Sequence, residues 1–127
     1  MKLNNECIRE LLLYVEENVY ISDDLDITNI DRLNYTKDEL LYTAIKLKEA
    51  GYLNATVELD IENYTEVIIH SLTWLGHKFL DNIRDDGVWK KTMGIISKFS
   101  SVSIGIIENV AAQVITNLIN QQLGQSL

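Results

Sequence analysis

The sequence lacks proline altogether and contains a single cysteine, Cys7. Proline breaks helix interiors, so its absence from 127 residues favours a mainly helical chain over a loop-rich β fold. A lone cysteine excludes an intramolecular disulfide and any metal site built from several cysteines. This cysteine usage fits a reducing compartment, and we expect a cytoplasmic protein. The N-terminal residues, MKLNNE, contain no apolar run after the lysine, so we expect no signal peptide.

Positive charge is also scarce. The chain has 11 Lys and Arg residues against 19 Asp and Glu residues, which gives a net charge of −8 at pH 7. Proteins that hold nucleic acid through bulk positive charge neutralise phosphates with Lys and Arg, so this class is disfavoured. The charge is uneven, at −5 over residues 1–35, −4 over 36–90 and +1 over 91–127. We therefore expect an acidic N-terminal part and a nearly uncharged C-terminal part.

Long hydrophobic runs are absent too. The longest stretch without a charged residue, 109–127, is interrupted by asparagines and glutamines. A membrane span needs about 20 mostly apolar residues, so this stretch is too polar for lipid. It is typical of a helix with one apolar side, and we expect no contact with a membrane.

Hydrophobic spacing predicts the order of the elements. Apolar side chains three and four residues apart predict helices over 5–18, 36–50, 73–86 and 88–99, and a longer one from about 101. Alternation predicts a hairpin of strands 52–61 and 65–72, and a short strand at 25–28. Thr36 and Glu39 form a capping box at the start of helix 36–50, and Gly51 suits its end. The β-branched content of 102–116 leaves a strand open there, although length and period favour a helix.

A capped helix followed closely by a hairpin is the arrangement of a winged helix-turn-helix. We therefore expect a mostly α fold with a small β-hairpin. The winged-helix core would comprise residues 1–86, and residues 87–127 would form a C-terminal helical extension. That extension would either pack within the chain or form a dimer, and the sequence leaves both open.

The start of the helix after the hairpin carries a distinctive run, LTWLGHKFLDNIRDD over residues 72–86, with Val88 and Trp89 just after it. This run resembles the signature of an uncharacterised family, the domain of unknown function 2513, found in bacteriophages, prophages and their bacterial hosts. Residues 8–16 and 49–53 resemble it as well. The resemblance implies a fold and a phage or bacterial source, and no mechanism. The motif residues for which we expect structural roles are Thr73, Trp74, Gly76, His77, Phe79 and Trp89.

Candidates for catalysis or metal binding are few. His77 and Asp81 lie one helical turn apart, but a site would need a nucleophile or a third ligand as well. The acidic residues of the 23–31 segment lack the glycine and the glutamate that an EF-hand calcium loop requires. We therefore expect no catalytic residue, no metal and no cofactor, and not an enzyme.

Fold analogy predicts a DNA-binding regulator, with 36–50 as recognition helix and 54–66 as wing. The residues expected to face DNA are Lys37, Tyr42, Thr43 and Lys46. The charges argue against it, because the helix carries as many anions as cations and the wing carries four acidic residues and no base.

The competing hypothesis is a protein-interaction or regulatory module that acts as a homodimer and contacts a host or phage protein. The dimer interface would be an apolar stripe on the last helix, namely Ile104, Ile107, Ala111, Val114 and Leu118. Packing of this stripe inside the chain is the equal alternative.

Overall fold

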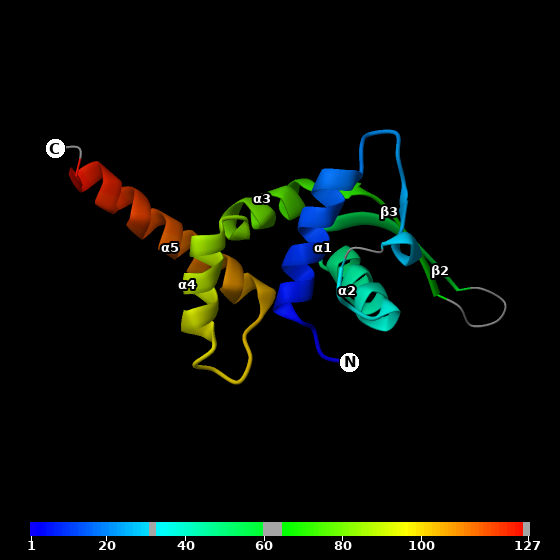
Figure 1. Ribbon diagram of the computed structural model, residues 1–127, viewed down its shortest axis with the longest axis horizontal. Coiled ribbons are helices and arrows are strands. Elements are labelled where there is room, and N and C mark those ends of the chain that lie inside the picture. Colours follow the sequence, from blue (N-terminus) through cyan, green and yellow to red (C-terminus); the bar gives the residue numbers. More distant parts are fainter. Residues whose placement is uncertain (31–32, 60–64, 126–127) are drawn as a thin grey trace. The chain divides into compact units, whose positions relative to one another are not determined.

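A computed structural model of the chain describes residues 1–30, 33–59 and 65–125 (Figure 1). Within these residues it contains five α-helices and one small antiparallel sheet, which confirms the expected mostly α fold with a β-hairpin. The chain divides into two compact units, residues 1–80 and 81–127. This division falls inside a helix, and earlier than the boundary between 86 and 87 that the sequence suggested.

Unit 1 holds helix α1 (Asn5–Asn18), strand β1 (Leu25–Asp26), a 3-10 turn (Ile27–Asn29), helix α2 (Lys37–Glu49) and strands β2 (Leu53–Leu59) and β3 (Thr65–Leu72). Helix α3 (Trp74–Ile83) begins in unit 1 and ends in unit 2. Unit 2 also contains α4 (Asp86–Ile96) and α5 (Ile104–Gln125). The predicted helices and the predicted hairpin are confirmed, while the predicted connection of the hairpin at 62–64 lies outside the described residues.

The sheet has the strand order β1-β3-β2, with every pair antiparallel. Strand β3 is central, pairing with β2 from Leu53↔Leu72 onward and with β1 through Leu25↔Ile69. The first two residues of the strand predicted over 25–28 therefore pair with β3. The expected strand over 25–28 is shorter than predicted, because the chain turns into the 3-10 helix at Ile27.

The core of unit 1 forms where α1 and α2 pack on each other and on the sheet. The apolar stripe of α1 follows the helical spacing of three and four residues, and all of its members are buried: Ile8, Leu11, Leu12 and Val15. The sheet contributes Leu53, Val67 and Ile69. Removing this apolar surface from water is the main force that holds α1 and α2 on the sheet.

Both ends of α2 are fixed as the sequence predicted. At its start the Thr36 hydroxyl accepts from the Glu39 amide, and the Glu39 carboxylate accepts from the Thr36 amide, each at 3.1 Å. At its end Gly51 adopts φ +86°. The amides of Gly51 and Tyr52 donate back to the carbonyls of Lys48 and Leu47, which completes a Schellman motif.

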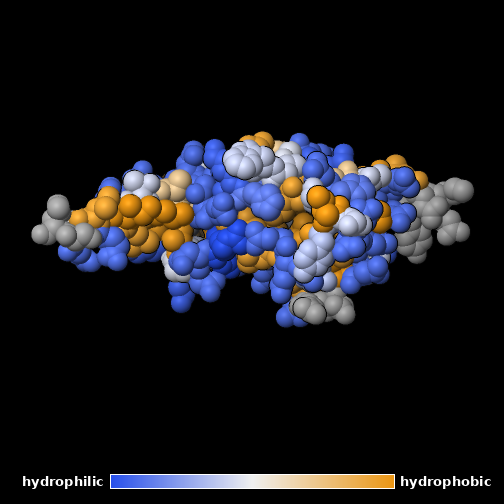
Figure 2. All heavy atoms as spheres, turned by 90° about the horizontal axis from the view of Figure 1, so that it is seen from above, coloured by the Kyte–Doolittle hydropathy of each residue, from blue (hydrophilic) through white to orange (hydrophobic). Residues whose placement is uncertain are grey.

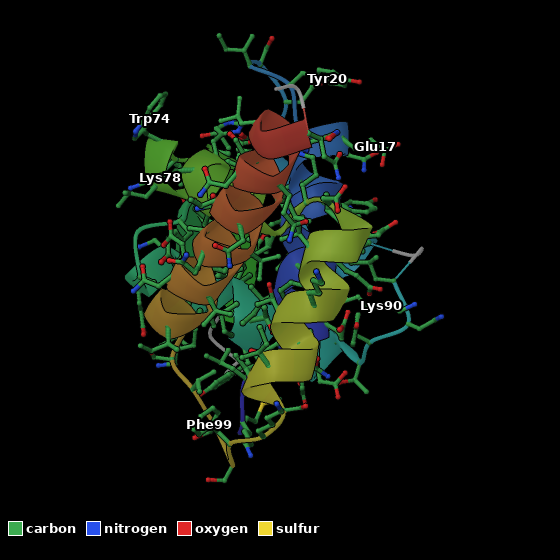
Figure 3. All side chains as sticks on the ribbon, turned by 90° about the vertical axis from the view of Figure 1, so that its left-hand side faces the viewer. Glu17, Tyr20, Trp74, Lys78, Lys90 and Phe99 are labelled. Carbon is green, nitrogen blue, oxygen red and sulfur yellow. The ribbon has the colours of Figure 1, made fainter. Side chains whose placement is uncertain are left out.

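In unit 2, helices α4 and α5 lie side by side (Figure 3). Helix α4 begins at its cap Asp85, whose carboxylate accepts from the Val88 amide at 2.9 Å. The buried side chains of α4 are Val88, Trp89, Thr92 and Ile96, and those of α5 are Ile107, Ala111 and Val114. Because α5 is helical throughout, the alternative of a strand over 102–116 is wrong.

Candidate interaction surfaces

Thr73 and Gly76 fix the start of α3 against the turn that follows α2. The Thr73 amide donates to the Tyr52 carbonyl at 3.1 Å, and its hydroxyl donates to the Gly51 carbonyl at 2.6 Å and accepts from the Gly76 amide at 3.0 Å. A Cβ at Gly76 would lie 2.1 Å from the Tyr52 carbonyl oxygen, so this contact needs glycine. The ring of buried Phe79 lies 5.1 Å from that of Tyr52. These motif residues have structural contacts that explain them.

The remaining motif residues divide between core and surface. Trp89 is only 6% exposed, in the packing of α4. Trp74 is 83% exposed, and His77 is exposed as well. Figure 3 shows Trp74 and Lys78 pointing away from α3 on the same side. Trp74 and His77 were expected to have structural roles like their neighbours, because the residue spacing in the motif contains no signal that distinguishes exposed from buried positions.

The structure separates the four residues expected to face DNA. Thr43 is 3% exposed, and its hydroxyl donates to the Glu39 carbonyl at 2.6 Å and lies 3.4 Å from the Cys7 sulfur. It therefore belongs to the contact between α1 and α2 and is not available to a ligand. The sequence did contain the signal, because Thr43 falls on the stripe of Leu40, Ala44 and Leu47.

Tyr42 and Lys46 come together on α2, where the Lys46 ammonium lies 5.5 Å from the centre of the Tyr42 ring. The same ammonium pairs with the Glu49 carboxylate at 2.9 Å. Lys37 is exposed at the first turn of the helix. Because Lys46 is already paired, this face offers phosphates less attraction than its number of lysines suggests.

The described part of the wing is acidic. Glu58 of β2 and Glu66 of β3 are directly opposite each other in the sheet, and both are exposed. Like charges in this position repel each other, and they would also repel the phosphates of DNA.

The net charge follows the division into units. Residues 1–80 contain seven basic and fifteen acidic residues, a net charge of −8, whereas residues 81–127 contain four of each and are neutral. The charge of the whole chain therefore belongs to unit 1, which carries the predicted recognition helix and wing.

The apolar stripe of α5 is partly used inside unit 2. Ile107, Ala111 and Val114 are at most 7% exposed, in the packing of α4 and α5. Ile104 is half-buried and Leu118 is 36% exposed. From Thr116 to Gln125 every residue is exposed. Three of the five residues predicted for a dimer interface are thus core residues of the unit itself.

An apolar groove follows further along α5. It has a volume of about 450 Å³ and is lined by Asp85, Val88, Ile115, Leu118, Ile119, Gln122 and Leu123. Ile119 is 52% exposed and Leu123 is 61% exposed. Figure 2 shows a continuous hydrophobic area beside the grey C-terminal atoms. Exposed apolar patches of this kind are candidates for interaction sites, and of the five residues predicted for the dimer interface only Leu118 lines this groove.

Reactive groups elsewhere in the described residues are tied into the fold. Cys7 is fully buried, and burial raises the pKa of its thiol, so it is a poor nucleophile. His70 lies between the Asp24 carboxylate and the Thr56 hydroxyl, at 2.7 Å from each, and joins the 19–24 segment to the sheet. Across the described residues, no three His, Cys, Asp or Glu side chains gather as metal ligands. The described helices include none with the length and apolarity to cross a membrane.

Comparisons with known proteins identify the same family that the motif over residues 72–86 resembles. A family model described as "Hypothetical protein (DUF2513)" matches residues 2–103. An uncharacterized protein of Haemophilus influenzae is 31% identical over 123 residues, which cover 94% of this chain and 99% of that protein. No solved structure matches. The chain therefore belongs to the DUF2513 family of hypothetical proteins.

Proposed function

We propose that this protein is a non-enzymatic winged-helix module for protein–protein interaction or regulation, and that it acts as a homodimer through the second half of α5. The observation that carries the proposal is the apolar groove beside Ile119, on a helix whose last residues are all exposed. The phage or prophage source and the cytoplasmic location implied by the sequence belong to the same proposal.

The winged-helix assignment rests on topology. A helix, α2, leads directly into the β2–β3 hairpin, and β1 adds a third strand on the far side of β3. The short 3-10 turn at 27–29 stands where a helix-turn-helix has its first helix.

Charge favours a second copy of the chain as the occupant of the groove. Contact between unit 1 of one copy and unit 1 of another is unfavourable, because each of these units carries a net charge of −8. Unit 2 is neutral, and residues 109–125 carry no charge, so two copies can meet there without repulsion. A twofold interface places the same patch of each chain against the other, which suits one apolar helix face.

The spacing in the groove suits a helix pair. Ile115, Ile119 and Gln122 follow one another at intervals of four and three residues, and Leu118 lies four residues before Gln122. Side chains at such intervals form a seam along one side of a helix. Two α5 helices would bury the exposed parts of Leu118, Ile119 and Leu123 against each other.

A matched pair of variants tests the dimer. Ile119 lies in the groove and is 52% exposed, while Ile106 lies in the same helix outside the groove and is 48% exposed. We expect sedimentation velocity to find a dimer at tens of micromolar for the natural chain and for Ile106→Asp, and a monomer for Ile119→Asp. Circular dichroism should show both variants folded, because both positions are exposed. A natural chain that sediments as a monomer at these concentrations would contradict the proposal.

A DNA-binding regulator using helix 36–50 and wing 54–66 is the alternative, supported by the same topology. A regulator would bind random duplex DNA at low salt and lose affinity steeply as salt rises. We expect no binding at low salt, because unit 1 is acidic, Thr43 is buried and Lys46 is paired with Glu49. Tight, salt-sensitive binding would favour the regulator instead.

A further inference from the structure

Helix α1 carries a second groove, on the side away from its buried stripe. The groove has a volume of about 270 Å³ and is lined by Glu10, Leu13, Tyr14 and Glu17 of α1 and by Leu33 from the segment before α2. The four α1 residues follow one another at intervals of three, one and three, so they share one face of the helix. The groove lies within unit 1, and the dimer proposed above does not use it.

The groove combines an apolar floor with two carboxylates. Leu13, Leu33 and the Tyr14 ring supply the apolar surface, and Glu10 and Glu17 are the first and last of the lining residues along α1. Glu10 and Glu17 are seven positions apart along the helix, a rise of about 10 Å. A ligand that fits this surface needs apolar groups in the middle and positive charges about two helical turns apart.

Glu10 is held in place by a neighbour. The Tyr35 hydroxyl donates a hydrogen bond to the Glu10 carboxylate, and burial together with this bond raises the pKa of Tyr35. Tyr35 therefore remains a neutral donor at physiological pH. A carboxylate oriented in this way loses less conformational freedom when it pairs with a cation.

Two exposed apolar side chains follow α1 in the sequence. Tyr20 is 67% exposed and Ile21 is fully exposed, directly after the C-terminal end of α1. Figure 3 shows Glu17 and Tyr20 at the same end of this helix. Two acidic residues, Asp23 and Asp24, follow. The residues just after α1 thus also combine exposed apolar groups with negative charge.

We propose that this groove docks a basic amphipathic helix of a partner protein. The partner's apolar side chains would pack on Leu13 and Tyr14, and lysine or arginine residues two turns apart would pair with Glu10 and Glu17. Charge complementarity selects this occupant, because unit 1 carries a net charge of −8 and attracts a cationic segment over distance. The same charge repels a second copy of the chain and repels nucleic acid.

A synthetic peptide tests the docking. The probe is a fluorescein-labelled 18-residue peptide of leucine and lysine with its leucines on one helical face, and the control is a shuffled peptide of the same composition. Fluorescence anisotropy at physiological salt measures their binding to the full chain. We expect the amphipathic peptide to bind at least about tenfold more tightly than the shuffled one, since only its helix presents apolar and cationic groups together.

Two charge reversals locate the binding surface. Glu17→Lys reverses a charge in the groove, and Glu58→Lys makes the same change of net charge on the wing; both side chains are exposed, so both variants should fold. We expect Glu17→Lys to weaken binding by about tenfold or more and Glu58→Lys to change it by less than about twofold. Equal losses in both variants, equal binding of both peptides or no binding would each overturn the proposal. None of these outcomes depends on the oligomeric state, because the dimer uses α5.

Discussion

Replacement of Gly76 by alanine is the sharpest test of how α3 is held. The added Cβ would lie 2.1 Å from the Tyr52 carbonyl oxygen, whereas real Cβ atoms essentially never come closer than 3.0 Å to such an atom. The obstacle is backbone, so no side chain can turn aside to make room. Helix α3 and the turn at Tyr52 must therefore move apart by nearly an ångström.

That movement disturbs the hydrogen bonds that join α3 to the turn. The Thr73 amide donates to the same Tyr52 carbonyl, and the Thr73 hydroxyl donates to the carbonyl of Gly51. Overpacking costs about 1–3 kcal/mol, and each weakened hydrogen bond costs about 1 kcal/mol. The better helix propensity of alanine returns about 1 kcal/mol. We expect Gly76→Ala to lower the free energy of unfolding by about 2–4 kcal/mol.

The matched control is Gly94→Ala in α4, where an added Cβ meets nothing within 4 Å. There only the helix propensity changes, so we expect a gain of about 0.5–1 kcal/mol. Urea unfolding followed by far-UV circular dichroism measures both variants, and in a Trp74→Phe background the fluorescence of buried Trp89 reports unit 2 separately. If Gly76→Ala raised the unfolding midpoint as Gly94→Ala does, the account of the α3 contact would be refuted.

Three further predictions concern unit 1. Thr36→Ala removes the hydroxyl that caps α2 and should lower the free energy of unfolding by about 1 kcal/mol in urea titrations, whereas Thr36→Ser should not. The pKa values of Tyr35 and Cys7 are raised in the folded chain, so their contribution to stability is present at neutral pH and is lost as the pH rises above about 9. Tyr35→Phe should flatten the part of that loss above about pH 10 in unfolding experiments. Cys7 should resist alkylation by iodoacetamide at pH 8 until urea unfolds the chain, and rapid alkylation of the native protein would contradict its burial.

Local signals made most of the fold predictable. The capping box of α2, the left-handed Gly51 and the stripe of α1 are short-range patterns, and each one depends on residues within two helical turns. The pairing of β1 with β3 was not predictable, because its two residues are too short for a pattern and their partners lie more than forty positions away.

The surfaces were harder to predict than the elements, and α5 shows the physical reason. Its apolar stripe runs on without a break, whereas α4 has 11 residues and α5 has 22. At 1.5 Å a residue these helices span about 16 Å and about 33 Å, so α4 covers only part of α5. The spacing of apolar residues predicts which side of a helix is apolar. It does not predict how far along that side a second helix packs. Ile107 and Val114 are therefore core residues and Leu118 is exposed, although all three belong to one apolar stripe.

The division of charge makes the two proposed interactions physically separable. Docking on α1 is an attraction between opposite charges at an exposed surface, so added salt should weaken it. Pairing through α5 buries uncharged apolar surface, and the charge that opposes it is the −8 of unit 1 on each copy. Salt screens that repulsion and leaves the apolar contact intact, so it should preserve or strengthen the dimer. A single surface serving both interactions could not respond to salt in opposite directions, whereas an acidic unit and a neutral unit in one chain can.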